Sequence, residues 1–477
     1  MPEWTAETVA RITEGTLYGS QELEVRGCVL DSRQARSGEM FFALPGERVD
    51  GHDFMAAAWK NGAALVVGEK GYFQKRVQKP YVPEGKALLL VDSALEALQK
   101  LAGVWRLELG AKVVGVTGSN GKTTTKDMIA AVLSQHFSVY RNKENHNNEL
   151  GLPLTILNAP PGTEILVLEM GMRGLGEIKA LCEIGKPDIG VITNIGTAHL
   201  ELLLTQERIA QAKWELVEAL PAGGVAILNA EDENSVQKSR GDAHRVLFFG
   251  VDEGLRHPDI QGSRLTPKGA LGTEFKVSFR DQKTDAYLPL PGRHNVLDAL
   301  AALAVGTVLD ISLADGCAGL KELELSKMRL ELRSGIYETT LLNDVYNANP
   351  VSMQASLRTL KERANGNKTL AILGEMYELG TSAVAGHREV GQTLARLGIS
   401  ALITVGALAK DIADGARLAG YSENQIYITE TRDEAARIAR DFLAAEGTGA
   451  WVLIKGSRGM KMEEVTVQLE RSEKRME

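Results

Sequence analysis

The chain has few cysteines and no excess of positive charge, and each shortage argues against a class of protein. Its three cysteines, Cys28, Cys182 and Cys317, are far apart, odd in number and without metal-ligand spacing. They indicate inert thiols in a reducing cytosol rather than a disulfide framework. A net charge of −8 argues against a nucleic-acid-binding surface, although it is compatible with a local basic pocket for a phosphorylated small molecule.

Long apolar segments are missing as well. No apolar run of about 18 residues occurs, so no segment is expected to enter or span a membrane. The first residues, MPEWTAETVARITEGTL, carry scattered charges and no apolar core, so we expect no signal peptide. With 44% hydrophobic residues, the composition is that of an ordinary globular protein. We therefore expect a cytoplasmic protein, and we expect it to be a monomer.

The length of 477 residues is too great for one hydrophobic core and predicts about three domains. We place them at 1–108, 109–326 and 327–477. The first mixes short strands and helices. In the other two, short apolar runs alternate with helical stretches, which predicts α/β domains built on parallel sheets. The last domain is expected to be doubly wound and Rossmann-like.

Strands are predicted in the second domain at 112–116, 165–168 and 189–192, with a helix at 122–137. Polar residues follow each of these strands, and parallel sheets bind ligands at the carboxyl ends of their strands. In the last domain, strands are predicted at 369–373, 401–405 and 450–454, and helices at 352–364 and 407–418.

The stretch GVTGSNGKTTT, at 115–125, joins the first of these strands to the helix, which is the context of a phosphate-binding loop. Backbone N–H groups at the helix start would hold phosphate oxygens, Lys122 would neutralise the β/γ charge, and Thr123 would offer its hydroxyl to Mg²⁺. The glycines lie at 115, 118 and 121, whereas the usual pattern would place the first at 116. The sequence therefore predicts a nucleoside triphosphate site formed by Gly118, Ser119, Asn120, Gly121, Lys122, Thr123 and Thr124.

Three further residues are candidates for the reaction itself. Glu169 ends a predicted strand, and His199 follows the next strand, so both are expected beside the phosphate loop as metal ligands. Lys213 lies inside the apolar stripe of a predicted helix, where an ammonium group must lower its pKa or find a partner. A lysine that extends to water from the edge of the stripe is the alternative. The stripe consists of Ile209, Ala212, Leu216, Val217 and Leu220.

The spacing G-x-x-G-x-x-G-K-T-T is the form found in Mur ligases and folylpolyglutamate synthetases. Further motifs extend this resemblance: LDSR…ALPGERVDGHDF, NHNNELGLPLTIL, LEMGMRGLGEI, TNIGTAHLE, GRHNVLDALAALA, NDVYNANPVSM and KGSRGMKMEEV. They fall in the order expected of one Mur ligase and cover all three predicted domains. The chain therefore resembles the Mur ligase family over nearly its full length.

This resemblance implies an ATP-dependent amide ligase of peptidoglycan synthesis. ATP would phosphorylate a carboxylate of UDP-N-acetylmuramoyl-tripeptide to give an acyl phosphate, and the amine of D-alanyl-D-alanine would displace the phosphate. The resemblance also implies two magnesium ions. Thr123 and Glu169 would hold one of them, and His199 would hold the second together with Lys213, carbamylated on its amine.

Other positions are carried over from the resemblance one by one. Asn295 would face the adenine, and Arg329 and Asp344 would reach the nucleotide from the last domain, Asp344 at the ribose. Asn343 stands where relatives tend to carry an acidic residue, and His146 where they tend to carry an apolar one. The first domain would hold the UDP-sugar through Ser32, Arg33, Arg48, Asp50 and His52. The muramoyl-peptide would be contacted by Asn145, Asn147 and Asn148.

Asn347 and Asn349, in YNANP, resemble the positions that distinguish the dipeptide-adding enzyme. An amide can donate to a carboxylate and accept from an ammonium, which suits a zwitterionic dipeptide. The alternative is an Asx-turn and a helix cap before Pro350, which Asn-Pro favours. Different asparagines could fill the two roles at once.

Three other functions compete with this interpretation. The ligase that adds the third stem-peptide residue carries an Asp-Asn-Pro-Arg-type motif that is absent here. Folylpolyglutamate synthetase lacks a first domain of the kind predicted at 1–108. A P-loop switch or transport ATPase would need a magnesium strand that ends in Asp, rather than Glu169 with a lysine in a helix stripe. The sequence does not distinguish lysine from diaminopimelate in the accepted tripeptide.

Overall fold

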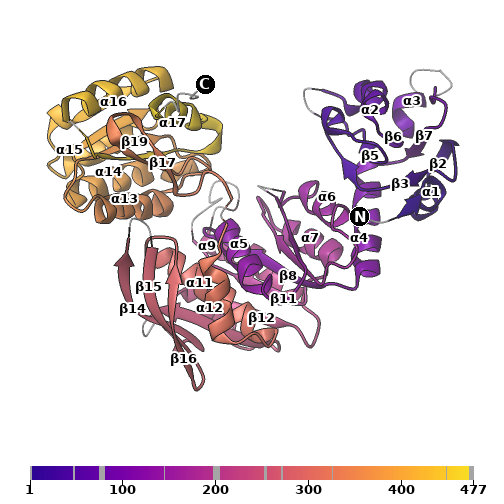
Figure 1. Ribbon diagram of the computed structural model, residues 1–477, viewed down its shortest axis with the longest axis horizontal. Coiled ribbons are helices and arrows are strands. Elements are labelled where there is room, and N and C mark those ends of the chain that lie inside the picture. The colour runs from indigo at the N-terminus through magenta and orange to yellow at the C-terminus, as the bar shows by residue number, and fades with distance from the viewer. Residues whose placement is uncertain are drawn as a thin grey trace, which may run out of the picture.

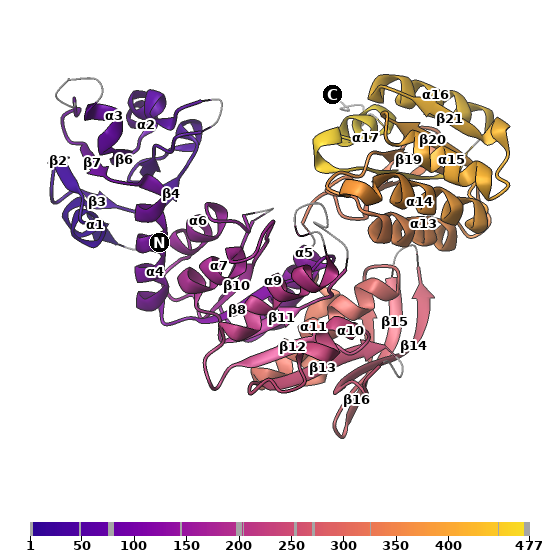
Figure 2. The ribbon, with the colours of Figure 1, turned by 180° about the vertical axis from the view of Figure 1, so that it is seen from behind.

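The computed structural model describes residues 3–46, 49–74, 81–143, 146–196, 203, 205–251, 255–269, 272–324, 326–446 and 448–471. These residues form three α/β domains in a bent arrangement, with the central domain at the base and the first and last domains at the two tips (Figures 1 and 2). The predicted fold class is therefore confirmed. Among the described helices, none has the length and apolarity needed to cross a membrane.

The first domain is built on a five-stranded sheet of order β2-β7-β6-β5-β4, in which only the β2–β7 pair is antiparallel. The buried runs in β6 and β7 form its centre. The strands are β2 (Thr16–Gly19), β4 (Cys28–Val29), β5 (Met40–Phe42), β6 (Leu65–Glu69) and β7 (Ala87–Val91), beside the small pair β1 (Trp4–Thr5) and β3 (Glu24–Val25). The helices are α1 (Ala6–Thr13), α2 (Met55–Asn61), α3 (Lys70–Gln74) and α4 (Ala94–Leu109).

The central domain carries a nine-stranded sheet of order β16-β15-β14-β13-β12-β11-β8-β10-β9. It is parallel from β9 to β14, and β14 to β16 extend it as an antiparallel meander. Its strands are β8 (Lys112–Thr117), β9 (Val139–Arg141), β10 (Ile165–Glu169), β11 (Ile189–Ile192), β12 (Val225–Asn229), β13 (Arg245–Val251), β14 (Ile260–Lys268), β15 (Gly272–Phe279) and β16 (Gln282–Leu288).

Helices cover both faces of this sheet. On one face lie α4, α6 (Gly151–Leu157), α7 (Glu177–Gly185), α9 (Gln206–Glu218) and α10 (Glu233–Lys238). On the other lie α5 (Lys122–Leu133), α11 (Arg293–Val308) and α12 (Leu313–Lys321). The hydrophobic core of the first face also contains residues of the first domain, such as Val9 and Leu89, because α4 packs against both.

The last domain has a six-stranded sheet of order β17-β18-β22-β19-β20-β21, parallel except for β17–β18. Its strands are β17 (Glu331–Ser334), β18 (Thr340–Asn343), β19 (Thr369–Gly374), β20 (Ala401–Val405), β21 (Ile426–Thr429) and β22 (Trp451–Lys455). One face packs against α13 (Pro350–Ala364), α14 (Ala383–Leu397) and α15 (Lys410–Leu418). The other packs against α16 (Arg432–Glu446) and α17 (Glu463–Leu469), so the domain is doubly wound as predicted.

The predicted elements around the phosphate loop are present with small shifts at their ends. The strand at 112–116 continues to Thr117, and the helix predicted at 122–137 ends at Leu133. It ends there because its buried stripe stops, since the next residues, 134–136, are exposed. All three cysteines are buried and free, as expected of inert thiols.

Candidate active site

The phosphate loop connects β8 to α5, and each of its glycines has a separate structural reason. Gly115 lies within β8, where a Cβ would approach Leu216 to 2.8 Å. Gly118 has a φ of 154°, and a Cβ there would lie 1.8 Å from the Thr193 hydroxyl. Gly121 has a φ of 79° and starts α5 against Asp298, which a Cβ would meet at 2.4 Å. The unusual spacing therefore reflects close packing at three points.

The middle of the loop is held by the end of β11. The Asn120 carbonyl accepts hydrogen bonds from the Thr193 hydroxyl at 2.5 Å and from Nδ2 of Asn194 at 3.0 Å. The Asn120 N–H donates to Oδ1 of Asn194 at 3.0 Å. The two residues after β11 thus fix the backbone of Asn120 through both its N–H and its carbonyl.

Lys122 and Thr123, at the start of α5, face the carboxyl end of β10. The Lys122 ammonium donates to the Gly118 carbonyl at 2.8 Å. Burial lowers the pKa of Lys122, the Glu169 carboxylate acts in the opposite direction, and the Arg329 guanidinium lowers it further. The Thr123 hydroxyl donates to Oε2 of Glu169 at 2.7 Å, and Nδ2 of Asn147 donates to Oε1 at 2.8 Å.

This arrangement fits a magnesium ion. Glu169 is 2% exposed, and a hydroxyl oxygen lies directly beside its carboxylate. Hydroxyl and carboxylate oxygens beside a triphosphate site are the hard ligands that Mg²⁺ prefers. Because one oxygen of Glu169 already accepts from Thr123, binding the ion would require that hydroxyl to turn its proton away.

Lys213 is 1% exposed on α9, where the residues from Ile209 to Val217 are all buried except Gln211 and the predicted apolar stripe belongs to the hydrophobic core. Burial holds the pKa of Lys213 well below its usual value, and the neighbouring Lys122 ammonium lowers it further. Within the described part of the chain, the amine has no hydrogen-bond partner, and its side chain contributes to the wall of a large cavity that also contacts the phosphate loop. The prediction that Lys213 is buried is therefore correct.

The last domain reaches the loop through Arg329 and Asn349. Nη2 of Arg329 donates to the Thr123 hydroxyl oxygen at 2.7 Å, and the guanidinium lies over the Tyr346 ring at 4.0 Å. Nδ2 of Asn349 donates to Oδ1 of Asn120 at 2.6 Å. Two side chains of the last domain therefore contact the phosphate loop directly.

These groups surround a cavity of about 850 Å³ between the central and last domains, which we call the central cavity. Of the residues predicted from the sequence, it brings together Ser119, Asn120, Gly121, Lys122, Thr123, Thr124, Asn147, Asn148, Glu169, Lys213, Asn295, Arg329, Asp344, Asn347 and Asn349. Gly118 does not line the cavity, but its carbonyl accepts the hydrogen bond from Lys122. Three predicted residues, Arg48, Asn145 and His199, lie outside the described residues.

Four predicted residues of the first domain, Ser32, Arg33, Asp50 and His52, do not line this cavity. His52 is buried; its Nε2 accepts from the Glu69 N–H at 2.8 Å, and its Nδ1 lies 2.6 Å from Asp50. The Nδ1 proton therefore points to the Asp50 carboxylate. The exposed Arg33 pairs with Asp31 at 2.7 Å. These contacts lie within the first domain and are separate from the central cavity.

The asparagines of the predicted substrate motifs also make internal bonds. Oδ1 of Asn148 accepts from the Gly151 N–H at 2.9 Å, and Oδ1 of Asn347 accepts from Ala348 at 2.8 Å. Nδ2 of Asn295 donates to the Pro291 carbonyl at 2.7 Å, which leaves its Oδ1 to accept. Asn343 is buried between Glu331 and Thr466, so it has a structural role in this chain.

Sequence reasoning gave no role to several charged or titratable residues of the cavity wall, among them Lys455, Asp298 and His294. Lys455 ends the apolar run of β22, and Asp298 interrupts the apolar helix α11, which are the signals that could have identified them. Burial raises the pKa of Asp298 well above its usual value and lowers that of His294 to about 4. His294 is therefore neutral at pH 7, and its charged neighbours are Asp344, Lys455 and Arg358.

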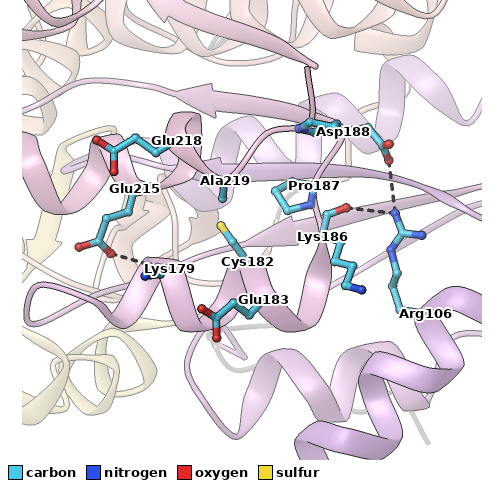
Figure 3. A pocket seen from close by; sticks show the side chains of 11 residues that line it. Arg106, Lys179, Cys182, Glu183, Lys186, Pro187, Asp188, Glu215, Glu218 and Ala219 are labelled. Carbon is cyan, nitrogen blue, oxygen red and sulfur yellow. Dashed lines mark hydrogen bonds and ion pairs between the residues drawn. The ribbon is translucent and has the colours of Figure 1, made fainter. Parts of the chain in front are cut away.

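A second cavity, of about 690 Å³, opens between α4, α7 and α9 near the amino end of β11 (Figure 3). It contains none of the predicted site residues. Arg106 crosses one end of it, donating to the carbonyls of Gly185 and Lys186 at 3.0 Å, while Glu215 accepts from the N–H groups of Gly176 and Lys179 at the other. Because this cavity lies at the opposite edge of the sheet from the phosphate loop, the central cavity is the candidate active site.

Comparison with known proteins gives a consistent result over the whole chain. Three profiles match: "Mur ligase family, catalytic domain" at 24–106, "Mur ligase middle domain" at 116–306, and "Mur ligase, glutamate ligase domain" at 328–458. The UDP-N-acetylmuramoyl-tripeptide–D-alanyl-D-alanine ligase of Bacillus subtilis is 36% identical, and that of Escherichia coli 33%, each covering 98% of both chains.

Solved structures agree with these relatives. The crystal structure of MurF from Acinetobacter baumannii is 30% identical, with a TM-score of 0.85 over 98% of this chain and 99% of that one. The structure of MurF ligase from Thermotoga maritima in complex with ADP is also 30% identical, with a TM-score of 0.76 over 93% of this chain and 97% of that one.

Proposed function

The chain belongs to the Mur ligase family, and from this premise we propose that it joins D-alanyl-D-alanine to UDP-N-acetylmuramoyl-tripeptide at the expense of ATP. It is an ATP-dependent ligase that forms a C–N bond in peptidoglycan synthesis. The observation that carries the proposal is the central cavity, where the phosphate loop, Glu169 and Lys213 meet Arg329 and Asn347 of the last domain.

The reaction requires a carboxylate and a triphosphate, both anionic, to come together. When bound, ATP supplies the phosphoryl group, which a carboxylate oxygen of the tripeptide accepts as ADP leaves. The amine nitrogen of the dipeptide then attacks the acyl carbon, the bond to phosphate breaks, and the nitrogen loses a proton. Lys122 and Arg329 provide positive charge beside the phosphate loop, where hydrogen bonds to Gly118 and Thr123 orient them.

We propose that the ATP phosphates bind at 118–124 and that Asn295 accepts from the adenine amino group through its unoccupied Oδ1. Asp344 would accept from the ribose. Its carboxylate already accepts from Lys455, Ser356 and Leu330, but a carboxylate has about four acceptor positions. These assignments rest on the shared cavity and on the residue types.

For the metal, we propose that Thr123 and Glu169 hold one magnesium ion, which supplies neutralisation of phosphate charge. A second ion would be held by His199 and by Lys213 as a carbamate. Support for the carbamate comes from a buried amine with a depressed pKa that opens on the central cavity. The neutral amine nitrogen would attack the carbon of dissolved CO₂ and lose a proton, which leaves a carboxylate on a long side chain.

We propose that the first domain holds the UDP-sugar through Ser32, Arg33, Arg48, Asp50 and His52. Asn145, Asn147 and Asn148 would contact the muramoyl-peptide, and Asn347 the dipeptide. The positions of Asn147 and Asn148 support the assignment to the muramoyl-peptide, since both line the central cavity beside Glu169 of the central domain. We also propose that the protein acts in the cytoplasm as a monomer.

A product assay tests the function. ADP and phosphate should form only when ATP, the UDP-tripeptide and D-alanyl-D-alanine are all present, together with the ligated pentapeptide. Lys122→Ala should reduce the rate of ligation by several orders of magnitude. Lys112 is an exposed lysine before the same loop, and Lys112→Ala should leave the rate unchanged. ATP hydrolysis that is independent of the dipeptide, or normal ligation by Lys122→Ala, would contradict the proposal.

A further inference from the structure

Asn349 uses every polar atom of its side chain, and only part of this use concerns its own helix. Its Oδ1 accepts from the Ser352 backbone N–H at 2.9 Å, and the backbone N–H of Asn349 donates to the Ser352 hydroxyl at 3.0 Å. Together these two bonds form a capping box at the start of α13. Its Nδ2 leaves the helix and donates to Oδ1 of Asn120 at 2.6 Å.

Capping alone does not require an asparagine. Serine, threonine and aspartate cap helices about as well, because each supplies an oxygen for the N3 N–H. Aspartate has no donor, and a serine or threonine hydroxyl would have to accept and donate through one short-armed oxygen, whereas asparagine accepts through Oδ1 and donates through a separate nitrogen. The donor half of the Asn349 side chain is therefore free of the capping role and serves the contact with Asn120.

Asn120 is thereby held from two sides. Thr193 and Asn194 of the central domain bind its peptide group, and Asn349 of the last domain binds its side chain. Its neighbours Ser119 and Gly121 belong to the stretch that receives the phosphates. Since peptide orientation decides where loop N–H groups point, the side-chain bond bears on the phosphate site.

We infer that Asn349 is a positioning residue for ATP: through Asn120, the start of α13 sets the conformation of the phosphate loop. The inference rests on the proposed function only in taking ATP as the ligand of the loop. It also changes the expectation for this residue, assigning it to the loop rather than to the dipeptide, because Oδ1 and Nδ2 each already make a bond within the protein and leave only one N–H of Nδ2 as a further donor. Asn347, whose Nδ2 makes no bond to another described residue, is the asparagine left for that task.

Asn349→Ser is the decisive variant, because serine keeps a neutral cap but is too short to reach Asn120. Calorimetry with ADP and Mg²⁺ should show binding weakened roughly fivefold, as expected for one neutral hydrogen bond. Asn120→Ala should weaken binding by a similar factor. If the two residues act through one contact, the double variant should be no weaker than the weaker single variant.

Two further measurements separate positioning from stability and from dipeptide binding. Ser352→Ala removes the reciprocal bond of the capping box without touching Asn120, so it should lower Tm but leave ADP affinity unchanged. In the ligation assay, Asn349→Ser should raise the KM for ATP and leave that for D-alanyl-D-alanine unaltered. Losses that multiply in the double variant, or a rise in the KM for the dipeptide alone, would overturn the inference. If Asn349 and Asn120 affect ADP binding through one contact but the protein does not ligate, the inference about Asn349 is supported and the proposed function is refuted.

Discussion

Lys455 and Asp344 form a buried ion pair across the carboxyl ends of two neighbouring strands, with 2.6 Å between Nζ and Oδ2. Lys455 also donates to the Asn347 carbonyl at 3.0 Å, and the Ser356 hydroxyl donates to Asp344 at 2.7 Å. Burial acts to raise the pKa of Asp344, but the charge and hydrogen bond of Lys455 outweigh it and hold the pKa below its usual value. The pair therefore connects YNANP to KGSRG in the folded protein.

Removing one partner should be far more damaging than removing both. Lys455→Met leaves an uncompensated buried carboxylate, and we expect the free energy of unfolding to fall by about 3 kcal/mol. The double variant Asp344→Asn/Lys455→Met should recover most of this loss. Urea denaturation measures both. A single variant as stable as the wild type would show that the pair does not depend on its charges.

The same pair predicts a dependence on pH. Because the pKa of Asp344 is lower in the folded than in the unfolded chain, its contribution is complete above the ordinary value of 3.8 and is lost as the pH falls through the lower, folded value. The stability difference between wild type and the double variant should thus stay constant from pH 7 to about 4 and shrink below that. A difference that already shrinks near pH 6 would contradict this.

Lys213→Met should separate activity from stability. Methionine is long and apolar, so replacing an unpartnered buried amine should raise the free energy of unfolding by about 1 kcal/mol in CO₂-free buffer while ligation is lost. Lys126 is the matched control, since it is 0% exposed but donates to the Asn142 carbonyl at 2.9 Å. Lys126→Met should therefore lose stability, by leaving that carbonyl unsatisfied.

The proposed carbamate has its own signature. Wild-type protein in ¹³C-bicarbonate should give one carbamate carbon signal, and Lys213→Met should give none. If the wild type shows no such signal, Lys213 is buried for packing alone, and the second magnesium ion requires another ligand.

Glu169→Gln should change the magnesium requirement. Glutamine keeps the shape and can still accept from Thr123, but it lacks the negative charge that a hard cation needs. The Mg²⁺ concentration for half-maximal ligation should rise at least tenfold, by titration at saturating ATP. Glu164→Gln, an exposed position just before the same strand, is the control and should match the wild type. An unchanged requirement would remove Glu169 from the metal site.

Ligand binding should bring the first and last domains closer together. Arg329 of the last domain already touches Thr123, whereas the residues predicted to hold UDP belong to the first domain, at the other tip of the molecule (Figure 2). The reacting carboxylate belongs to the UDP substrate. It therefore reaches the phosphate loop only when the first and last domains both hold their ligands against the central domain. Small-angle scattering should show a smaller radius of gyration with UDP-tripeptide and a non-hydrolysable ATP analogue together than with either alone. An unchanged radius with both ligands bound would argue against this.

The parts of the site that follow locally from the chain were predictable. The phosphate loop, Glu169 at the end of β10 and the burial of Lys213 each depend on a short pattern of apolar and polar residues. Contacts between distant segments were not. Nothing near Asn349 in the sequence indicates a bond to Asn120, and Asp298 meets Gly121 only because α11 packs on α5.

The fold shows the same division. Buried parallel strands were predicted from continuous apolar runs, but the antiparallel meander β14 to β16 was not. Its strands alternate exposed and buried residues, as in β15, where Phe275 and Val277 are buried while Glu274 and Lys276 are exposed, and this pattern is weaker than an unbroken run. Motif resemblance also named residues predicted to bind UDP, but the motifs did not indicate that the described ones lie away from the central cavity.

Because α4 joins the first domain to one face of the central sheet in a single core, the gene could be divided only at certain points. A break near residue 108 would expose Leu101 and Trp105, which are buried among residues of both domains. A break near residue 325 would leave each piece with complete cores, since the last domain owns two of its own. Two fragments made by that second cut should each be expressed in folded form and reassemble when mixed, with Asp127 accepting from the Ser326 N–H at the junction.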